Sequence, residues 1–123
     1  MSLTRDEALQ RVIELVADIF ERDAAELHAQ THLMADLPCE SIDLLEISIR
    51  LGAAFHITVD DEAAFLRSLR LLMEGGAPEL ARAYPHLSEQ RREELLRQRD
   101  QRGGLSPLTL GDLADYAVWM SRD

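Results

Sequence analysis

Lysine is absent from this sequence, and all 13 basic residues are arginine. The 23 acidic residues outnumber them and give a net charge of −10 at pH 7. Because an acidic surface repels phosphate, nucleic acid is excluded as a default partner. The same charge favours partner proteins with basic surfaces, since long-range attraction steers the two molecules together.

Cysteine, aromatic residues and long apolar runs are also scarce. Cys39 is the only cysteine, which excludes an internal disulfide and a cysteine-built zinc site. Aromatic residues make up 5% of the 123 residues, so we expect a core of leucine, isoleucine, valine and alanine. No apolar run is long enough to span a membrane, and the acidic first residues lack a signal-peptide pattern. These features predict a soluble, cytoplasmic protein with one domain over residues 1–123.

The remaining pattern is helical almost throughout. Thr4 and Glu7 have the spacing of a capping box, in which two side chains bind free backbone N–H groups at a helix start. Apolar residues follow at helical spacing and predict a first helix over about residues 5–22. A long polar loop comes next, and its isolated leucines predict that it is pinned to the core.

Residues 41–55 predict a second helix with two apolar stripes instead of one. The inner stripe consists of Leu44, Ile47, Leu51 and Phe55. The outer stripe consists of Ile42, Leu45 and Ile49, and the charged residues between the two are Asp43, Glu46 and Arg50. A helix at the edge of a small domain needs one buried stripe. Either both stripes are buried between other helices, or one of them meets a partner protein.

After the second helix, residues 55–59 alternate in polarity and predict an extended connector whose Ile57 and Val59 enter the core. Residues 66–104 differ from the rest because arginines slightly outnumber acids there. We expect helices from about 62 to 73, from Pro78 to just before Pro85, and over 89–102. This segment is predicted to be a helical insertion on a complete domain, its arginines pairing either with the acidic body or with an acidic partner.

Few side chains suggest chemistry. His28 and His32 have the spacing of two metal ligands on a helix, but no third ligand is nearby, and solvated loop histidines are the preferred interpretation. Cys39 lacks the pocket and the orienting group that a nucleophilic thiol needs, so we interpret it as a small packing residue. The sequence therefore predicts no metal site, no catalytic site and no enzyme activity.

Ser41 stands at the start of the second predicted helix. As an N-cap, its hydroxyl would accept a hydrogen bond from a free backbone N–H of the first turn. Alternatively, it carries a phosphate ester, which the free N–H groups and the positive dipole end of a helix would favour. Its position alone favours the capping role.

Four segments change that weighting. Residues 37–47, with Glu40-Ser41-Ile42 at their centre, resemble the acyl carrier protein family, in which an Asp-Ser-Leu motif opens the second helix. Residues 27–37 resemble the long first loop of that family, and residues 55–61 resemble the segment after its second helix. Residues 108–116, which begin with Leu108-Thr109-Leu110-Gly111-Asp112, resemble the entrance to its last helix.

The resemblance implies an all-α fold, a four-helix acyl-carrier-like bundle with an inserted helical segment at 66–104. It implies that Ser41 receives 4′-phosphopantetheine from a phosphopantetheinyl transferase. The chain would then hold an acyl intermediate as a thioester, in fatty acid, lipid or polyketide-type synthesis. Acyl-handling enzymes with basic docking patches would be its partners. The implied partner-binding residues are Glu40, Ile42, Asp43, Leu45, Glu46 and Ile49.

The sequence departs from the family pattern at several places. Glu40 replaces the aspartate of the motif, His56 stands where glycine is common, and the stretch from Val59 to Leu108 is far longer than usual. Two alternatives therefore remain beside the acyl carrier. One is an unmodified adaptor that kept the fold and lost the arm, and the other is a stand-alone peptidyl carrier.

Overall fold

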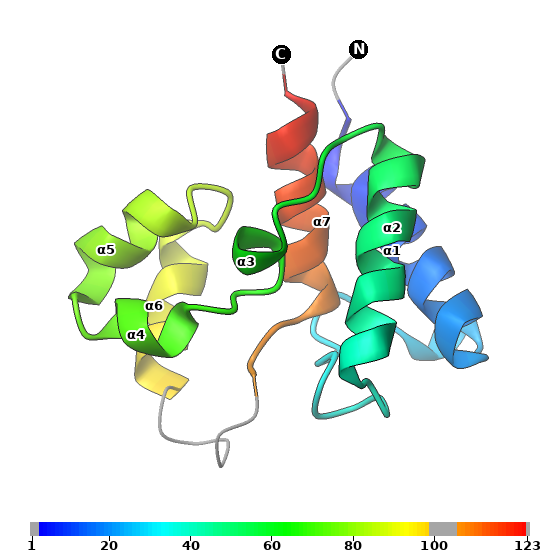
Figure 1. Cartoon of the computed structure of the whole chain (residues 1–123), viewed down its shortest axis with the longest axis horizontal. Helices are drawn as coiled ribbons and strands as arrows, with labels where there is room; N and C mark the ends of the chain where they lie inside the picture. Colours follow the sequence, from blue (N-terminus) through cyan, green and yellow to red (C-terminus); the bar gives the residue numbers. More distant parts are fainter. Residues whose placement is uncertain (1–2, 99–105, 123) are drawn as a thin grey trace.

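In the computed structural model, which describes residues 3–98 and 106–122, helices are the regular structure of the chain (Figure 1). Their order is α1 (Arg5–Phe20), η1 (Ala24–Glu26), α2 (Ser41–Phe55), α3 (Asp61–Ala64), α4 (Leu69–Met73), α5 (Gly76–Ala83), α6 (Glu89–Gln98) and α7 (Leu110–Ser121). The all-α prediction is confirmed. The helix predicted over 89–102 corresponds to α6, and the last part of that prediction, residues 99–102, lies outside the described residues.

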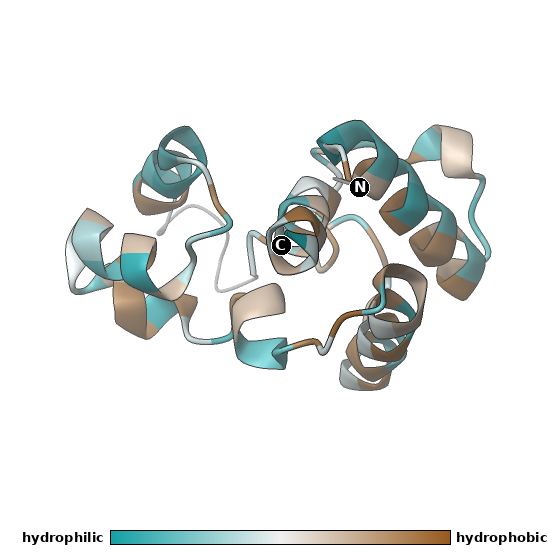
Figure 2. Cartoon of the chain, turned by 90° about the horizontal axis from the view of Figure 1, so that it is seen from above, coloured by the Kyte–Doolittle hydropathy of each residue, from teal (hydrophilic) through white to brown (hydrophobic). Residues whose placement is uncertain are grey.

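Two groups of helices flank α3 and the lower part of α7 (Figure 1). On one side α1 packs against α7 and α2, and on the other side α5 packs against α4 and α6. Figure 2, which looks down on the molecule, shows the same division, with α7 between the two groups. A single cluster of buried apolar residues runs through both groups, from Val12 in α1 to Leu95 in α6.

The predicted start of the first helix is confirmed, and Thr109 and Asp112, whose spacing is also that of a capping box, begin α7 in the same way. The Thr4 hydroxyl accepts the Glu7 backbone N–H at 3.1 Å, and the Glu7 carboxylate accepts the Thr4 N–H at 3.4 Å. Thr109 and Asp112 make the same reciprocal pair at the start of α7, at 3.2 and 3.0 Å. Each box satisfies two backbone donors that a helix start leaves free. The first helix ends at Phe20, two residues earlier than predicted, because Glu21 adopts a left-handed conformation with φ 54°.

The long loop before α2 is pinned to the core, as the sequence predicts, and it is also bonded to the start of α7. Backbone hydrogen bonds join Leu33 to Leu108 at 3.0 Å, Thr31 to Leu110 at 3.1 Å and Ala29 to Gly111 at 2.9 Å. The three leucines of the loop are buried in the core: Leu27, Leu33 and Leu37. The last of them lies four residues before Ser41, so the packed loop fixes where α2 begins.

At the other end of α2, His56 has φ 56° and ψ 47°, the left-handed conformation that glycine adopts most easily. The turn is therefore kept although histidine replaces glycine. The connector that follows holds Ile57 and Val59 half-buried against the core, as predicted. The Asp60 backbone N–H then donates to the Tyr116 hydroxyl at 2.9 Å, which ties the connector to α7.

The helical run predicted over 62–73 is wrong in one respect, because it breaks into α3 and α4. Leu66 lies between them with φ 53° and is 3% exposed. A left-handed conformation costs a branched residue about 1–2 kcal/mol. With this turn Phe65, Leu66 and Leu69 are all buried in the core. Burial of these side chains offsets the strain.

The segment from α4 to α6 is joined to α7 by side chains of α6 and of the loop before it. The Arg91 guanidinium in α6 donates to both carboxylate oxygens of Asp112, at 2.8 and 2.9 Å, and to the Pro107 carbonyl at 2.9 Å. The His86 ring lies 5.2 Å from the Tyr116 ring, edge to face. Burial lowers the pKa of His86 to about 4, so the ring is neutral near pH 7. The sequence predicts that the arginines of this segment pair either with the acidic body or with an acidic partner. Arg91 pairs with the acidic body.

Candidate functional site

Ser41 is the first residue of α2, and its side chain is exposed. The N-cap of this helix is Glu40, whose backbone N–H donates to Asp43 Oδ2 at 2.8 Å. The capping role considered for Ser41 is therefore wrong, because the cap lies one residue earlier. No described residue forms a hydrogen bond with the Ser41 hydroxyl, which leaves it available to an incoming group.

The two apolar stripes of α2 differ in burial, the inner one facing the core and the outer one facing solvent. On the inner stripe Ile47 and Leu51 are fully buried, Phe55 is 7% exposed, and Leu44 packs at the margin of the core. The outer stripe is in solvent, with Ile42 72%, Leu45 56% and Ile49 65% exposed. Burial of both stripes between helices is thus excluded. Three large apolar side chains on one exposed helix face form a patch of the kind that meets other proteins.

The charges beside the outer stripe are partly used within the chain. Asp43 serves the helix start through Glu40, and Glu46 accepts from Arg50 at 3.0 Å. Arg50 also donates to Asp18 on α1, a link between the two helices that the sequence analysis missed. The Glu46 side chain is nevertheless 50% exposed. It therefore keeps a face toward solvent that a basic partner can reach.

Cys39 lies two residues before Ser41 but is not suited to nucleophilic chemistry. Burial, together with the nearby carboxylates of Asp43 and Glu40, raises the pKa of its thiol to about 11. The thiol is therefore protonated near pH 7, and the thiolate is the reactive form. This fits the prediction of a small packing residue.

The structure places His28 and His32 beside polar neighbours in the loop. His28 is exposed, and its Nδ1 accepts the Gln30 backbone N–H at 3.2 Å. His32 lies 3.7 Å from the Asp36 carboxylate. Within residues 3–98 and 106–122, no three metal-ligating side chains gather in one place.

A polar pocket of about 640 Å³ lies between α6, the start of α7 and the first turn of α1. Its charged groups already pair with one another: Arg5 with Asp115 at 2.7 Å, and Arg91 with Asp112. Burial raises the pKa of Asp115, although Arg5 acts against it. The Arg91–Asp112 pair joins α6 to α7. Because the charged groups of the pocket are already paired, the exposed surroundings of Ser41 are the better candidate site.

None of the helices in the described part of the chain is both long and apolar enough to cross a membrane.

Comparison with known proteins gives the class of this site. Residues 10–74 match the family model described as "Phosphopantetheine attachment site", and this range includes α2 with Ser41. Phosphopantetheine is therefore the covalent prosthetic group of this class of domain, and the match covers more than half of the chain.

Curated relatives narrow the class to one family. The acyl carrier protein of Rubrobacter xylanophilus is 34% identical over 62 residues, which are 50% of this chain and 76% of the relative. That of Lactobacillus acidophilus is 32% identical over 68 residues, 54% of this chain and 85% of the relative. The chain belongs to the acyl carrier protein family. No solved structure matches it.

Membership of the acyl carrier protein family indicates the general role of the chain. Proteins of this family are carriers and not catalysts, and they interact with phosphopantetheinyl transferases and acyl-handling enzymes. The family match ends at residue 74, so α5, α6 and α7 lie beyond it. The likeness of residues 108–116 to the last helix of the family therefore stays a prediction, as does the assignment of 66–104 as an insertion.

Proposed function

We propose that Ser41 is the attachment residue for phosphopantetheine and that the chain carries an acyl intermediate as a thioester at the end of this arm. The observation that carries the proposal is the exposed hydroxyl at the start of α2, inside the matched region and without a hydrogen bond to any described residue. Nothing in the surrounding structure has to move for a group to be attached there.

The other serines of the matched region are poorer candidates. Residues 10–74 contain three serines, Ser41, Ser48 and Ser68. The Ser48 hydroxyl donates to Asp61 Oδ1 at 2.7 Å and is half-buried. Ser68 is half-buried between α3 and α4. Ser41 is the one whose hydroxyl is exposed, so it is the one that a second protein can reach.

The chain contributes a nucleophile and its placement. The Ser41 oxygen would attack the phosphorus of coenzyme A that is linked to pantetheine, forming a phosphodiester as the pyrophosphate bond breaks and the nucleotide leaves. The serine proton passes to a base of the transferase. Free N–H groups in the first turn of α2 favour the negative phosphate beside them. When bound, the group supplies a terminal thiol on a flexible arm, which tethers the cargo and raises its local concentration at each docked enzyme.

The outer stripe of α2 and the acids beside it would form the docking surface. Apolar contacts at Ile42, Leu45 and Ile49 would be buried by the partner, while Glu40, Asp43 and Glu46 would face its basic residues. Electrostatic attraction raises the association rate more than the affinity. Such binding suits a carrier that has to leave each enzyme after its step.

Replacing the serine tests the attachment site. Ser41→Ala is expected to abolish the mass increase that appears when the protein is incubated with coenzyme A, magnesium and a broad-specificity transferase. Ser48→Ala is the matched control and should be modified fully, because it leaves Ser41 in place. Intact-protein mass spectrometry reads both variants. Modification that persists in Ser41→Ala, or fails in wild type while a known carrier is modified, would contradict the proposal.

Charge reversal tests the docking surface. Glu46→Arg should slow association with the transferase severalfold and flatten its dependence on salt, because the reversed charge repels a basic patch. Stability should change by less than about 1 kcal/mol, since the Glu46–Arg50 pair is exposed. Glu93→Arg makes the same charge change on α6 and should leave the association rate nearly unchanged. Stopped-flow measurements at several salt concentrations compare the two, and equal slowing would assign the effect to net charge alone.

A further inference from the structure

The turn between α3 and α4 places an arginine next to strained backbone. Leu66 holds a left-handed conformation while its side chain enters the core, and Arg67, the next residue, is exposed. The Arg67 backbone N–H donates to the Glu62 carbonyl at 3.0 Å, which fixes the main chain at this point. The direction in which Arg67 leaves the turn is therefore set by the fold.

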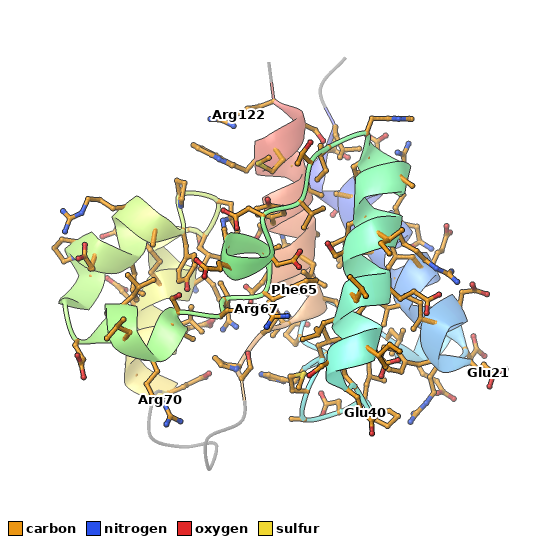
Figure 3. All side chains as sticks on the ribbon, in the orientation of Figure 1. Glu21, Glu40, Phe65, Arg67, Arg70 and Arg122 are labelled. Atoms are coloured by element: carbon orange, nitrogen blue, oxygen red, sulfur yellow. The ribbon has the colours of Figure 1, made fainter. Side chains whose placement is uncertain are left out.

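Arg67 faces the part of the molecule that carries Ser41. In Figure 3 its side chain leaves the turn and extends toward α2, whose lower end bears Glu40 and the candidate serine. Figure 2 shows α3 and α2 on the same side of α7, so the two elements are neighbours in both views. Glu40 points away from Arg67, below the end of the helix (Figure 3).

This arginine is one of several in the described part of the chain that have no acid of their own. Arg5, Arg50, Arg82 and Arg91 each pair with a carboxylate, whereas Arg67 makes no ion pair or side-chain hydrogen bond with any described residue. A guanidinium binds phosphate and carboxylate through two parallel N–H donors. Acidic residues outnumber arginines in the sequence before α3. An unpaired cation beside α2 is therefore opposite in charge to most ionised side chains of that region.

We propose that Arg67 binds an oxyanion carried by the arm, either its phosphodiester or a carboxylate of the cargo. The proposal rests on the attachment of the arm at Ser41. The phosphodiester would stay at the Ser41 oxygen, at the end of α2 toward which Arg67 extends, and the flexible arm would bring the cargo to the same side of the helix (Figure 3). In the second case the cargo would be an acid with a free carboxylate besides the thioester, and Arg67 would select for it.

Side-chain NMR of the full-length protein tests this inference without an activity assay. The transferase would load three forms, from coenzyme A, from acetyl-coenzyme A and from succinyl-coenzyme A, and mass spectrometry would verify each form before measurement. The Nε–Hε signal of Arg67 is assigned by its loss in Arg67→Gln. Arg97 of α6, which is also exposed and without an ion pair to a described residue, is the control in the same spectra.

A shift of the Arg67 signal in all three forms, with Arg97 unmoved, would assign the phosphodiester as the ligand. A shift confined to the succinyl form would assign the carboxylate of the cargo. No shift of Arg67 in any form of verified mass would overturn the inference while leaving the attachment site intact. Failure to load any form on Ser41 would instead overturn the proposed function, so the two failures are distinguishable.

Discussion

Replacing Arg91 with alanine is expected to lower the free energy of unfolding by about 3–5 kcal/mol. The side chain of Asp112, its partner, is 2% exposed, and the substitution leaves that carboxylate buried without a cation. Asp112 also holds the start of α7 through Thr109, so a disturbed carboxylate weakens the helix start as well. Urea denaturation followed by circular dichroism measures the loss.

Two further variants separate this effect from the loss of any surface charge. Arg82→Ala removes an arginine whose partner, Glu79, is on the surface, and should cost less than about 1 kcal/mol. The double variant Arg91→Met, Asp112→Asn removes both buried charges, and the amide oxygen can still accept from Thr109. It should recover much of the stability lost by Arg91→Ala, because breaking a buried pair costs more than replacing both members. A loss in Arg91→Ala no larger than that in Arg82→Ala would mean that the buried pair contributes little.

Leu51→Ala is expected to cost about 2–5 kcal/mol, while Leu45→Ala changes stability by no more than about 0.5 kcal/mol. Both remove the same atoms from the same helix. Leu51 is fully buried, so its truncation leaves a cavity in the core, whereas Leu45 is 56% exposed. Denaturation midpoints at an unchanged slope compare the variants.

The same pair distinguishes the two faces of α2 in binding. Leu45→Ala should weaken docking to a partner enzyme although it leaves the fold intact. Equal losses of stability in the two variants would mean that the outer stripe is buried in solution, by another copy of the chain or by a rearranged segment. That result would contradict the division of α2 into a core face and a docking face.

Features governed by local chemistry were predictable. The capping boxes at Thr4 and Thr109, the span of α2 and its division into two apolar stripes all follow from residue spacing within a few turns. Spacing alone left open which stripe is exposed. The candidate serine also came from a local motif. The N-cap role, one of the two alternatives considered for it, is wrong because Asp43 binds the Glu40 N–H and the cap lies one residue earlier.

Features that depend on distant contacts were not predictable. No intrinsic preference places a buried leucine in a left-handed conformation, so the break at Leu66 required the rest of the core. The pairing of Arg91 with Asp112 joins residues 21 positions apart, and charge counts could only offer it beside the alternative of an acidic partner. The orientation of Arg67 toward α2 belongs to the same group, since it follows from that break (Figure 3).

The packing of α1 on α7 also determines the order in which the molecule can be completed during synthesis. Arg5 and Asp115, which pair across these helices, are 110 positions apart. As the chain leaves the ribosome, α1 and α2 emerge long before α7, the helix against which the bundle closes. Contacts this far apart in sequence form late, since a long loop has to close before they contribute. The bundle therefore lacks the contacts of α1 and α2 with α7 until that helix has been made, and a transferase that requires the folded bundle can act only after α7 has emerged.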